Sequence, residues 1–180
     1  MKARLILTKK CQRSCPGCCN EYEQMKATMK TVPLEYVKNH SQVMITGGEP
    51  MLYPNMIKNI ISELRKQNPT RKIYLYTALY RKVMEEIILL VDGIHYTIHD
   101  NPSLNDISGF YKFQKLIANH KGSYRAYIDQ NVKDTIYVKP NVWSRFEIKQ
   151  WIPEGACDLP NGEELLVLSD PEKYDEKYVG

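Results

Sequence analysis

The segment RLILTKKCQRSCPGC, residues 4–18, passes from an apolar run into a loop that contains three cysteines. Cys11, Cys15 and Cys18 place three thiolates within eight residues, close enough to surround one compact metal centre. A structural zinc ion prefers four protein ligands, and the adjacent Cys19 is poorly placed to complete the same tetrahedron. A four-iron cluster held by three thiolates keeps one iron open for another ligand. The spacing therefore favours an iron–sulfur cluster, with a small zinc-stabilised binding module as the alternative.

A second motif, TGGEP at residues 46–50, follows the next strand-like segment. Gly47 and Gly48 at the carboxyl end of a strand let the backbone approach a ligand closely. Glu49 adds a carboxylate suited to an ammonium group, and Pro50 stiffens the exit from the turn. Because this turn comes one strand after the cysteine loop, we expect both at the same edge of a sheet.

Strand-like and helix-like patterns alternate along the chain. Strands are predicted at residues 4–8, 42–46, 72–78, 93–99, 123–129 and 146–152. Helices are predicted at residues 33–40, 55–68, 81–91 and 107–120. Such alternation produces a parallel sheet with right-handed crossovers. An eight-unit barrel needs ~250 residues, so the 180 residues predict an α/β fold of one domain, a partial (βα)6 barrel of six units.

The end of the chain differs from the rest in composition. We expect residues 1–152 to form the core and residues 153–180 to form a C-terminal extension, partly flexible because its last residues are charged and lack an apolar pattern. Within this extension, residues 163–168 are expected to form a short strand at the open edge of the barrel.

Three of the predicted strands carry polar side chains at alternate positions, which places them on one face of the sheet. They are His95, Thr97 and His99 on the fourth strand, Arg125, Tyr127 and Asp129 on the fifth, and Glu147 and Lys149 on the sixth. Because the outer helices need apolar neighbours, we expect this polar set to line an internal substrate cavity. The first three strands show no such polar face.

The charge balance argues against nucleic acid as a partner. The chain has 25 basic and 21 acidic side chains, a net charge of +4, and its basic residues are scattered. Nucleic-acid modules gather basic residues on one face.

No stretch approaches the roughly 20 apolar residues of a membrane helix, and the N-terminal apolar run is too short for a signal peptide. We therefore expect a cytoplasmic protein without a membrane partner.

The two motifs, in this order and at this separation, resemble those of the radical S-adenosylmethionine (SAM) superfamily, with a matching strand–helix pattern over residues 1–152. The resemblance implies that Cys11, Cys15 and Cys18 bind one [4Fe-4S] cluster, whose open iron chelates SAM. It also implies that residues 47–50 bind the amino end of SAM.

The activity that the resemblance implies is that of an oxygen-sensitive oxidoreductase. An electron, supplied by flavodoxin or ferredoxin, cleaves SAM to methionine and a 5′-deoxyadenosyl radical, which takes a hydrogen atom from a substrate. Candidates for further SAM contacts, by their position at strand ends, are Thr77, Thr97, His99 and Asp129. The candidate catalytic residues are Tyr127, as a substrate contact, and Cys157, near the end of the sixth strand.

Two positions in the cysteine loop indicate a subgroup. Gly17 stands where an aromatic residue usually precedes the third cysteine, and Asn20 stands two residues after that cysteine. In both respects the chain is similar to the activating enzymes of anaerobic ribonucleotide reductase, which act on a glycyl radical enzyme. Glu49 and Ala78 depart from that subgroup, which usually has Asp and Gly there. The alternative is a small-molecule or peptide-modifying enzyme similar to 7-carboxy-7-deazaguanine synthase, which shares the TGGEP turn but places Asp-Thr after its third cysteine.

Overall fold

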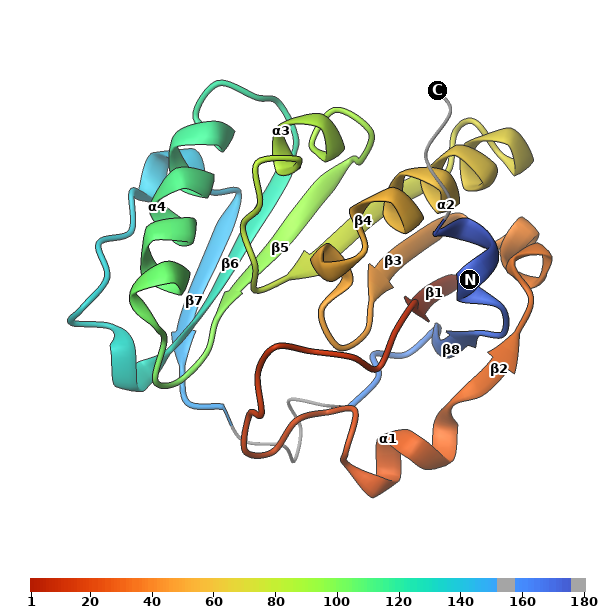
Figure 1. Ribbon diagram of the computed structural model, residues 1–180, viewed down its shortest axis with the longest axis horizontal. Helices are drawn as coiled ribbons and strands as arrows, with labels where there is room; N and C mark the ends of the chain where they lie inside the picture. The colour runs from red at the N-terminus through yellow and green to blue at the C-terminus, as the bar shows by residue number, and fades with distance from the viewer. Residues whose placement is uncertain (152–157, 176–180) are drawn as a thin grey trace.

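The computed structural model describes residues 1–151 and 158–175, and in this part of the chain eight parallel strands form one sheet (Figure 1). The strand order is β2-β8-β1-β3-β4-β5-β6-β7, so the sheet is open, with β2 and β7 at its edges. The strands are β1 (Lys2–Ile6), β2 (Lys30–Val32), β3 (Gln42–Thr46), β4 (Lys72–Thr77), β5 (Gly93–Ile98), β6 (Ser123–Asp129), β7 (Arg145–Lys149) and β8 (Glu163–Leu168).

Helices connect most of the strands. The α-helices are α1 (Glu23–Thr28), α2 (Pro54–Gln67), α3 (Met84–Ile87) and α4 (Leu104–Ile117). Short 3-10 helices occur at η1 (Leu34–Asn39), η2 (Pro50–Leu52), η3 (Gln130–Val132), η4 (Pro140–Val142) and η5 (Pro171–Tyr174). None of the helices in the described residues is both long enough and apolar enough to cross a membrane.

The structure confirms the predicted α/β class and the parallel sheet. The six predicted strands correspond to β1, β3, β4, β5, β6 and β7, and each pairs with the next in the order of the chain. The strand expected at residues 163–168 is present as β8, which lies between β1 and β2. The sheet does not close on itself, and a six-unit barrel remains a prediction.

Two helix predictions differ from the structure. The helix predicted at residues 81–91 is wrong in extent, because α3 ends at Ile87 and the chain continues in tight turns, with Leu90 N–H donating to the Ile87 carbonyl. The helix predicted at residues 33–40 is the 3-10 helix η1, which ends with His40 N–H donating to the Val37 carbonyl. Both segments are short connections whose tertiary contacts override a weak helical pattern.

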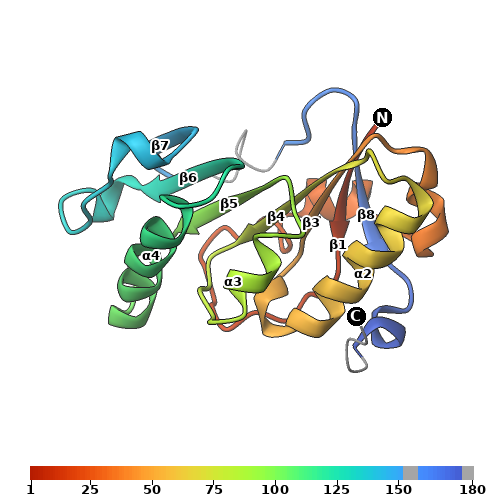
Figure 2. The ribbon, with the colours of Figure 1, turned by 90° about the horizontal axis from the view of Figure 1, so that it is seen from above.

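One face of the sheet is covered by α2, α3 and α4 (Figure 2). Strands that follow one another in a single direction through right-handed crossovers place all their helices on the same side. The apolar stripe of α2 is buried there, as its spacing predicts: Ile57, Ile60, Ile61 and Leu64 belong to the main core. This face is therefore the packed core of the molecule.

We refer to the opposite face of the sheet as the inner face. On β5, Tyr96 packs in the core, whereas His95 and Thr97 are half-buried on the inner face, as the alternation predicts. The expectation that the first strands lack polar side chains there is wrong, because Arg4 and Tyr76 also lie on this face. A single arginine in an apolar run and a tyrosine hydroxyl are both easily overlooked in a pattern of apolar residues.

Arg71 is almost fully buried and joins η1 to the end of α2. Its guanidinium donates to the carbonyl oxygens of His40 at 3.0 Å, Val37 at 2.9 Å and Lys38 at 2.7 Å. It also donates to the Leu64 carbonyl at 3.3 Å. The Val37 and Leu64 carbonyls also accept the backbone N–H groups of His40 and Asn68, so Arg71 adds a second donor at each helix end.

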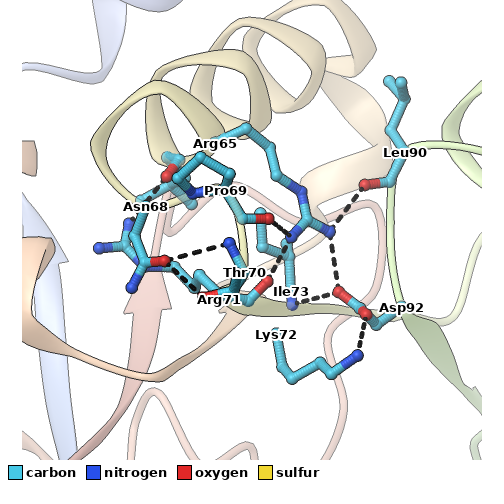
Figure 3. A network of polar contacts seen from close by, with 10 residues as sticks. Arg65, Asn68, Pro69, Thr70, Arg71, Lys72, Ile73, Leu90 and Asp92 are labelled. Atoms are coloured by element: carbon cyan, nitrogen blue, oxygen red, sulfur yellow. Dashed lines mark hydrogen bonds and ion pairs between the residues drawn. The ribbon is translucent and has the colours of Figure 1, made fainter.

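Asp92 is the centre of a second polar network, between α2, β4 and the turn before β5 (Figure 3). Its carboxylate accepts hydrogen bonds from Arg65 Nη2 at 2.8 Å, Lys72 Nζ at 2.8 Å and the Ile73 N–H at 2.9 Å. Arg65 also donates to the Leu90 carbonyl at 3.5 Å. Burial alone would raise the pKa of Asp92, but the bonds from Lys72, Ile73 and Arg65 outweigh burial and lower it.

We expect Asp92→Asn to reduce the free energy of unfolding at pH 7 by about 1–2 kcal/mol, because the charged acceptor of three hydrogen bonds is lost. The pKa of Asp92 is lower in the folded chain than in the unfolded chain. The contribution of its charge to stability is therefore fully present at pH values above ~3.9, the ordinary pKa of an Asp side chain. The contribution disappears as the pH falls through the lower, folded-state pKa. Urea unfolding of both proteins between pH 7 and pH 2.5 measures the difference, with the exposed Asp134→Asn as control. A difference that stays constant down to pH 2.5 would contradict this assignment.

Candidate functional site

The cysteine loop and the Gly-Gly turn leave the sheet side by side. β1 and β3 are paired in register, with Ile6 opposite Thr46, so their connections emerge at the same carboxyl edge. The pairing continues beyond the strands: Gly48 N–H donates to the Thr8 carbonyl at 2.6 Å and Glu49 N–H donates to the Lys10 carbonyl at 2.8 Å. The first residues of the cysteine loop are therefore fastened to the turn by backbone hydrogen bonds.

Both glycines are required for this close approach. Gly47 has φ +143°, which other residues rarely adopt, and a Cβ there would collide with the Thr8 carbonyl oxygen. A Cβ at Gly48 would collide with the Lys10 carbonyl oxygen. Asn20 closes the other end of the loop onto the turn, since its Nδ2 donates to the Gly47 carbonyl at 3.0 Å.

Glu49 holds the turn against the end of β4. Its carboxylate is 2% exposed and accepts hydrogen bonds from Met51 N–H at 2.9 Å, Thr77 Oγ1 at 2.6 Å and Ala78 N–H at 2.8 Å. Burial raises the pKa of Glu49, while these three donors and the charge of Arg13 oppose the change. A carboxylate has about four acceptor positions, so one remains for a further donor.

The loop presents three free thiols, Cys11, Cys15 and Cys18, of which Cys11 is exposed and the other two are half-buried. Burial raises the pKa of the Cys11 thiol; the N–H of Arg13 opposes this, and the negative charges of Glu49, Cys15 and Cys18 add to it. Binding to a cationic iron–sulfur core would offset these effects on the Cys11 thiol.

Within residues 1–151 and 158–175, no three His, Cys, Asp or Glu side chains converge tightly enough to hold a single metal ion. A four-iron cluster does not require such convergence, because each thiolate binds a different iron. Three unpaired thiols on one loop, next to a backbone turn that approaches closely, fit a [4Fe-4S] cluster.

A cavity of about 670 Å³ lies between the cysteine loop and the carboxyl ends of β5 and β6. Its volume is in the range of small-molecule and cofactor sites. Its lining includes Arg13, Cys15, His99, Asp106, Asp129 and Trp151. A candidate cluster ligand therefore lies in the wall of a cavity large enough for a second ligand.

The residues predicted to contact SAM separate into two groups. His99 and Asp129 line the cavity, whereas Thr77 is buried behind it, with its hydroxyl bonded to Glu49. Thr97 is half-buried on the inner face and does not line the cavity. Burial, with the charge of Arg13, lowers the pKa of His99 to about 4, so its imidazole is neutral at pH 7.

Of the two candidate catalytic residues, the structure describes Tyr127. Tyr127 is buried, and its hydroxyl donates to the Lys149 carbonyl at 2.9 Å. Its ring packs edge-on against Trp151, with centroids 5.4 Å apart, outside the lining of the cavity. Cys157 lies outside the described residues.

Arg13 and Asp106 are parts of the site that the sequence analysis did not identify. Arg13 Nη1 forms an ion pair with Asp106 at 2.5 Å, and Nη2 donates to the Asp100 carbonyl at 3.2 Å. Asp106 belongs to the capping box at the start of α4, where it accepts from Ser103 N–H at 2.8 Å. The pattern Ser-x-x-Asp before α4 indicates a cap, but only the fold shows that Arg13 is its partner.

Trp151 is a third such residue, and it explains the glycine before the third cysteine. Its indole Nε1 donates to the Gly17 carbonyl at 3.0 Å. Gly17 has φ +67°, a left-handed conformation that an aromatic residue would adopt only with strain. The ring of Trp151 also meets His99 edge-on at 5.9 Å, so an aromatic side chain from the far end of the sheet covers this part of the loop.

Residues 3–105, more than half of the chain, match the family model described as "4Fe-4S single cluster domain". A search of curated proteins finds no match. The matched segment contains the cysteine loop, the Gly-Gly turn and the carboxyl ends of β4 and β5. The chain therefore belongs to the 4Fe-4S single cluster domain family, an iron–sulfur family associated with radical SAM proteins.

Proposed function

We propose that this protein is a radical SAM enzyme. The observation that carries the proposal is the backbone pairing of the cysteine loop with the Gly-Gly turn. The same loop, through Arg13 and Cys15, forms part of the wall of the 670 Å³ cavity. With a bound [4Fe-4S] cluster and SAM, the site would supply one electron that cleaves SAM to methionine and a 5′-deoxyadenosyl radical, which abstracts a hydrogen atom from the substrate.

In this proposal the residues of the chain bind, orient and exclude water. Cys11, Cys15 and Cys18 hold three irons. The Gly-Gly turn receives the amino end of SAM, and Glu49 positions that turn while offering its remaining acceptor position. The neutral imidazole of His99 provides one donor and one acceptor for the nucleoside part in the cavity.

We further propose that the electron comes from flavodoxin or ferredoxin, binding near Cys11. Cys11 is exposed and its loop lies at the surface of the molecule (Figure 1), so a donor protein can approach the cluster directly.

The substrate that we favour is a segment of a glycyl radical enzyme. Gly17 and Asn20, the two positions on which that similarity depends, both hold the loop in place, Gly17 through Trp151 and Asn20 through Gly47. A stable glycyl radical detected by electron paramagnetic resonance on a co-encoded reductase, dependent on this protein and SAM, tests the proposal. SAM cleavage without any such radical would leave a small molecule or peptide as the substrate.

Cys15→Ala should abolish the proposed activity, because Cys11 and Cys18 alone are too few ligands to hold the cluster. Wild-type protein reconstituted without oxygen should bind about four irons per chain and form 5′-deoxyadenosine with dithionite and SAM. The variant should lose most of its iron and all product above background, whereas the exposed control Glu21→Gln should retain both. One zinc per chain in the wild type, with no iron and no product, would refute the assignment.

Gly48→Ala should retain iron but lose catalysis, because the added Cβ pushes the turn away from the Lys10 carbonyl. A displacement of about 1 Å costs roughly 100-fold in rate, and we expect a loss of that order in 5′-deoxyadenosine formation. The control is Gly162→Ala, where φ is +80° but no atom lies within 4 Å of the new Cβ. Gly162→Ala should lower the free energy of unfolding without changing the rate of 5′-deoxyadenosine formation. Equal rates for Gly48→Ala and wild type would show that the turn does not position SAM.

A further inference from the structure

A second, smaller cavity of about 150 Å³ lies on the inner face, at the amino ends of the strands. Residues from the first half of their strands form most of its walls, among them Lys2, Tyr74, His95, Arg125 and Glu163. Tyr76, further along β4, also lines it. None of these residues belongs to the wall of the larger cavity. The small cavity is therefore separate from the candidate SAM site, and the function proposed above assigns it no role.

Most polar side chains in the wall of this cavity are hydrogen-bond donors, and those named below have no acceptor among the described residues. In the described part of the chain, the side chains of Lys2, Tyr74, Tyr76, His95 and Arg125 form no hydrogen bond or ion pair with protein groups. The Tyr76 ring packs against His95, with 4.7 Å between the ring centroids. Unpaired polar groups in a concave site are available to a ligand.

The acidic groups nearby are already neutralised. Glu163 accepts from Arg4 Nε at 2.7 Å, and Glu147 pairs with Arg145 at 2.6 Å and Lys149 at 3.2 Å. Lys2 and Arg125 therefore leave an excess of positive charge at the cavity.

Neutral hydrogen-bond donors, from His95, Tyr74 and Tyr76, lie beside these positive charges. Burial and then the charge of Arg125 are the main causes that lower the pKa of His95 to about 4, so at pH 7 it offers one ring N–H. The hydroxyls of Tyr74 and Tyr76 are further donors. A guanidinium fork with O–H and N–H donors around it is the donor set that binds a phosphate or carboxylate group.

The strands connect this cavity to the larger one. His95 and Arg125 are paired in register on β5 and β6, and the next inner-face pair along these strands is Thr97 with Tyr127. His99 and Asp129, which line the large cavity, come two residues later. Four residues of parallel strand span about 13 Å.

We propose that the small cavity binds an anionic group, phosphate or carboxylate, of a substrate that extends along the inner face to the large cavity. The substrate, whether a protein segment or a small molecule, then carries an anionic group about 13 Å from its reacting carbon. That the anion belongs to the substrate rests on the proposed function, whereas anion binding itself does not.

The test uses the reconstituted full-length protein and inorganic phosphate or acetate as probes, by isothermal titration calorimetry at constant ionic strength. At least one probe should bind saturably, and Arg125→Gln should weaken that binding roughly tenfold or more, because the bidentate contact is lost. The control Lys112→Gln removes one exposed positive charge from α4, on the far side of the sheet, and should bind as wild type does. Tighter phosphate than acetate binding identifies a phosphate substrate, and the reverse identifies a carboxylate.

Chemical labelling locates the bound anion. Bound phosphate or acetate should slow the modification of Arg125 by phenylglyoxal, as peptide mass spectrometry would show. The control is Arg81, which donates to the Met51 and Leu52 carbonyls and does not line this cavity, so its modification should be unchanged. Failure of both probes to saturate, or equal affinity in Arg125→Gln, overturns the proposal. Since neither readout depends on SAM cleavage, such a failure is distinguishable from failure of the proposed enzymatic activity.

Discussion

The site depends on two backbone hydrogen bonds beyond the end of the sheet, from Gly48 to Thr8 and from Glu49 to Lys10. They extend the β1–β3 ladder into what would otherwise be two independent loops. A side chain at either glycine would force the two segments apart, since its Cβ would overlap a carbonyl oxygen. The position of the thiols relative to the turn is therefore set by main-chain geometry, which is the most rigid support that a loop can have.

The rest of the cysteine loop is held by side chains from three separate elements. Asn20 returns to the turn, Arg13 reaches the capping box of α4 through Asp106, and Trp151 closes over Gly17. Glu49 links the turn itself to the end of β4. These anchors come from distant parts of the chain, so the assembly of the sheet brings them to the loop.

The one-directional winding of the sheet determines where chemistry can occur. The helices α2, α3 and α4 lie on one face (Figure 2). The inner face of β4, β5 and β6 carries polar side chains, among them Tyr76, His95 and Arg125. Inner-face residues contribute to the walls of both cavities, His99 and Asp129 to the large one and His95 and Arg125 to the small one. A sheet with helices on both faces would have filled this space with apolar side chains.

The sequence by itself determined the parallel α/β sheet, the six main strands, the buried stripe of α2 and the three thiols beside the Gly-Gly-Glu-Pro turn, because periodicity and motif spacing are local properties. It could not identify Arg13, Asp106 and Trp151 as neighbours, since 93 residues separate the first two and 134 residues separate Trp151 from Gly17. It placed Thr77 among cofactor contacts, whereas the packing of Glu49 turns that hydroxyl inward. Only the tertiary structure decided which polar groups are satisfied by the protein and which remain open to a ligand, because that depends on contacts between residues far apart in the chain.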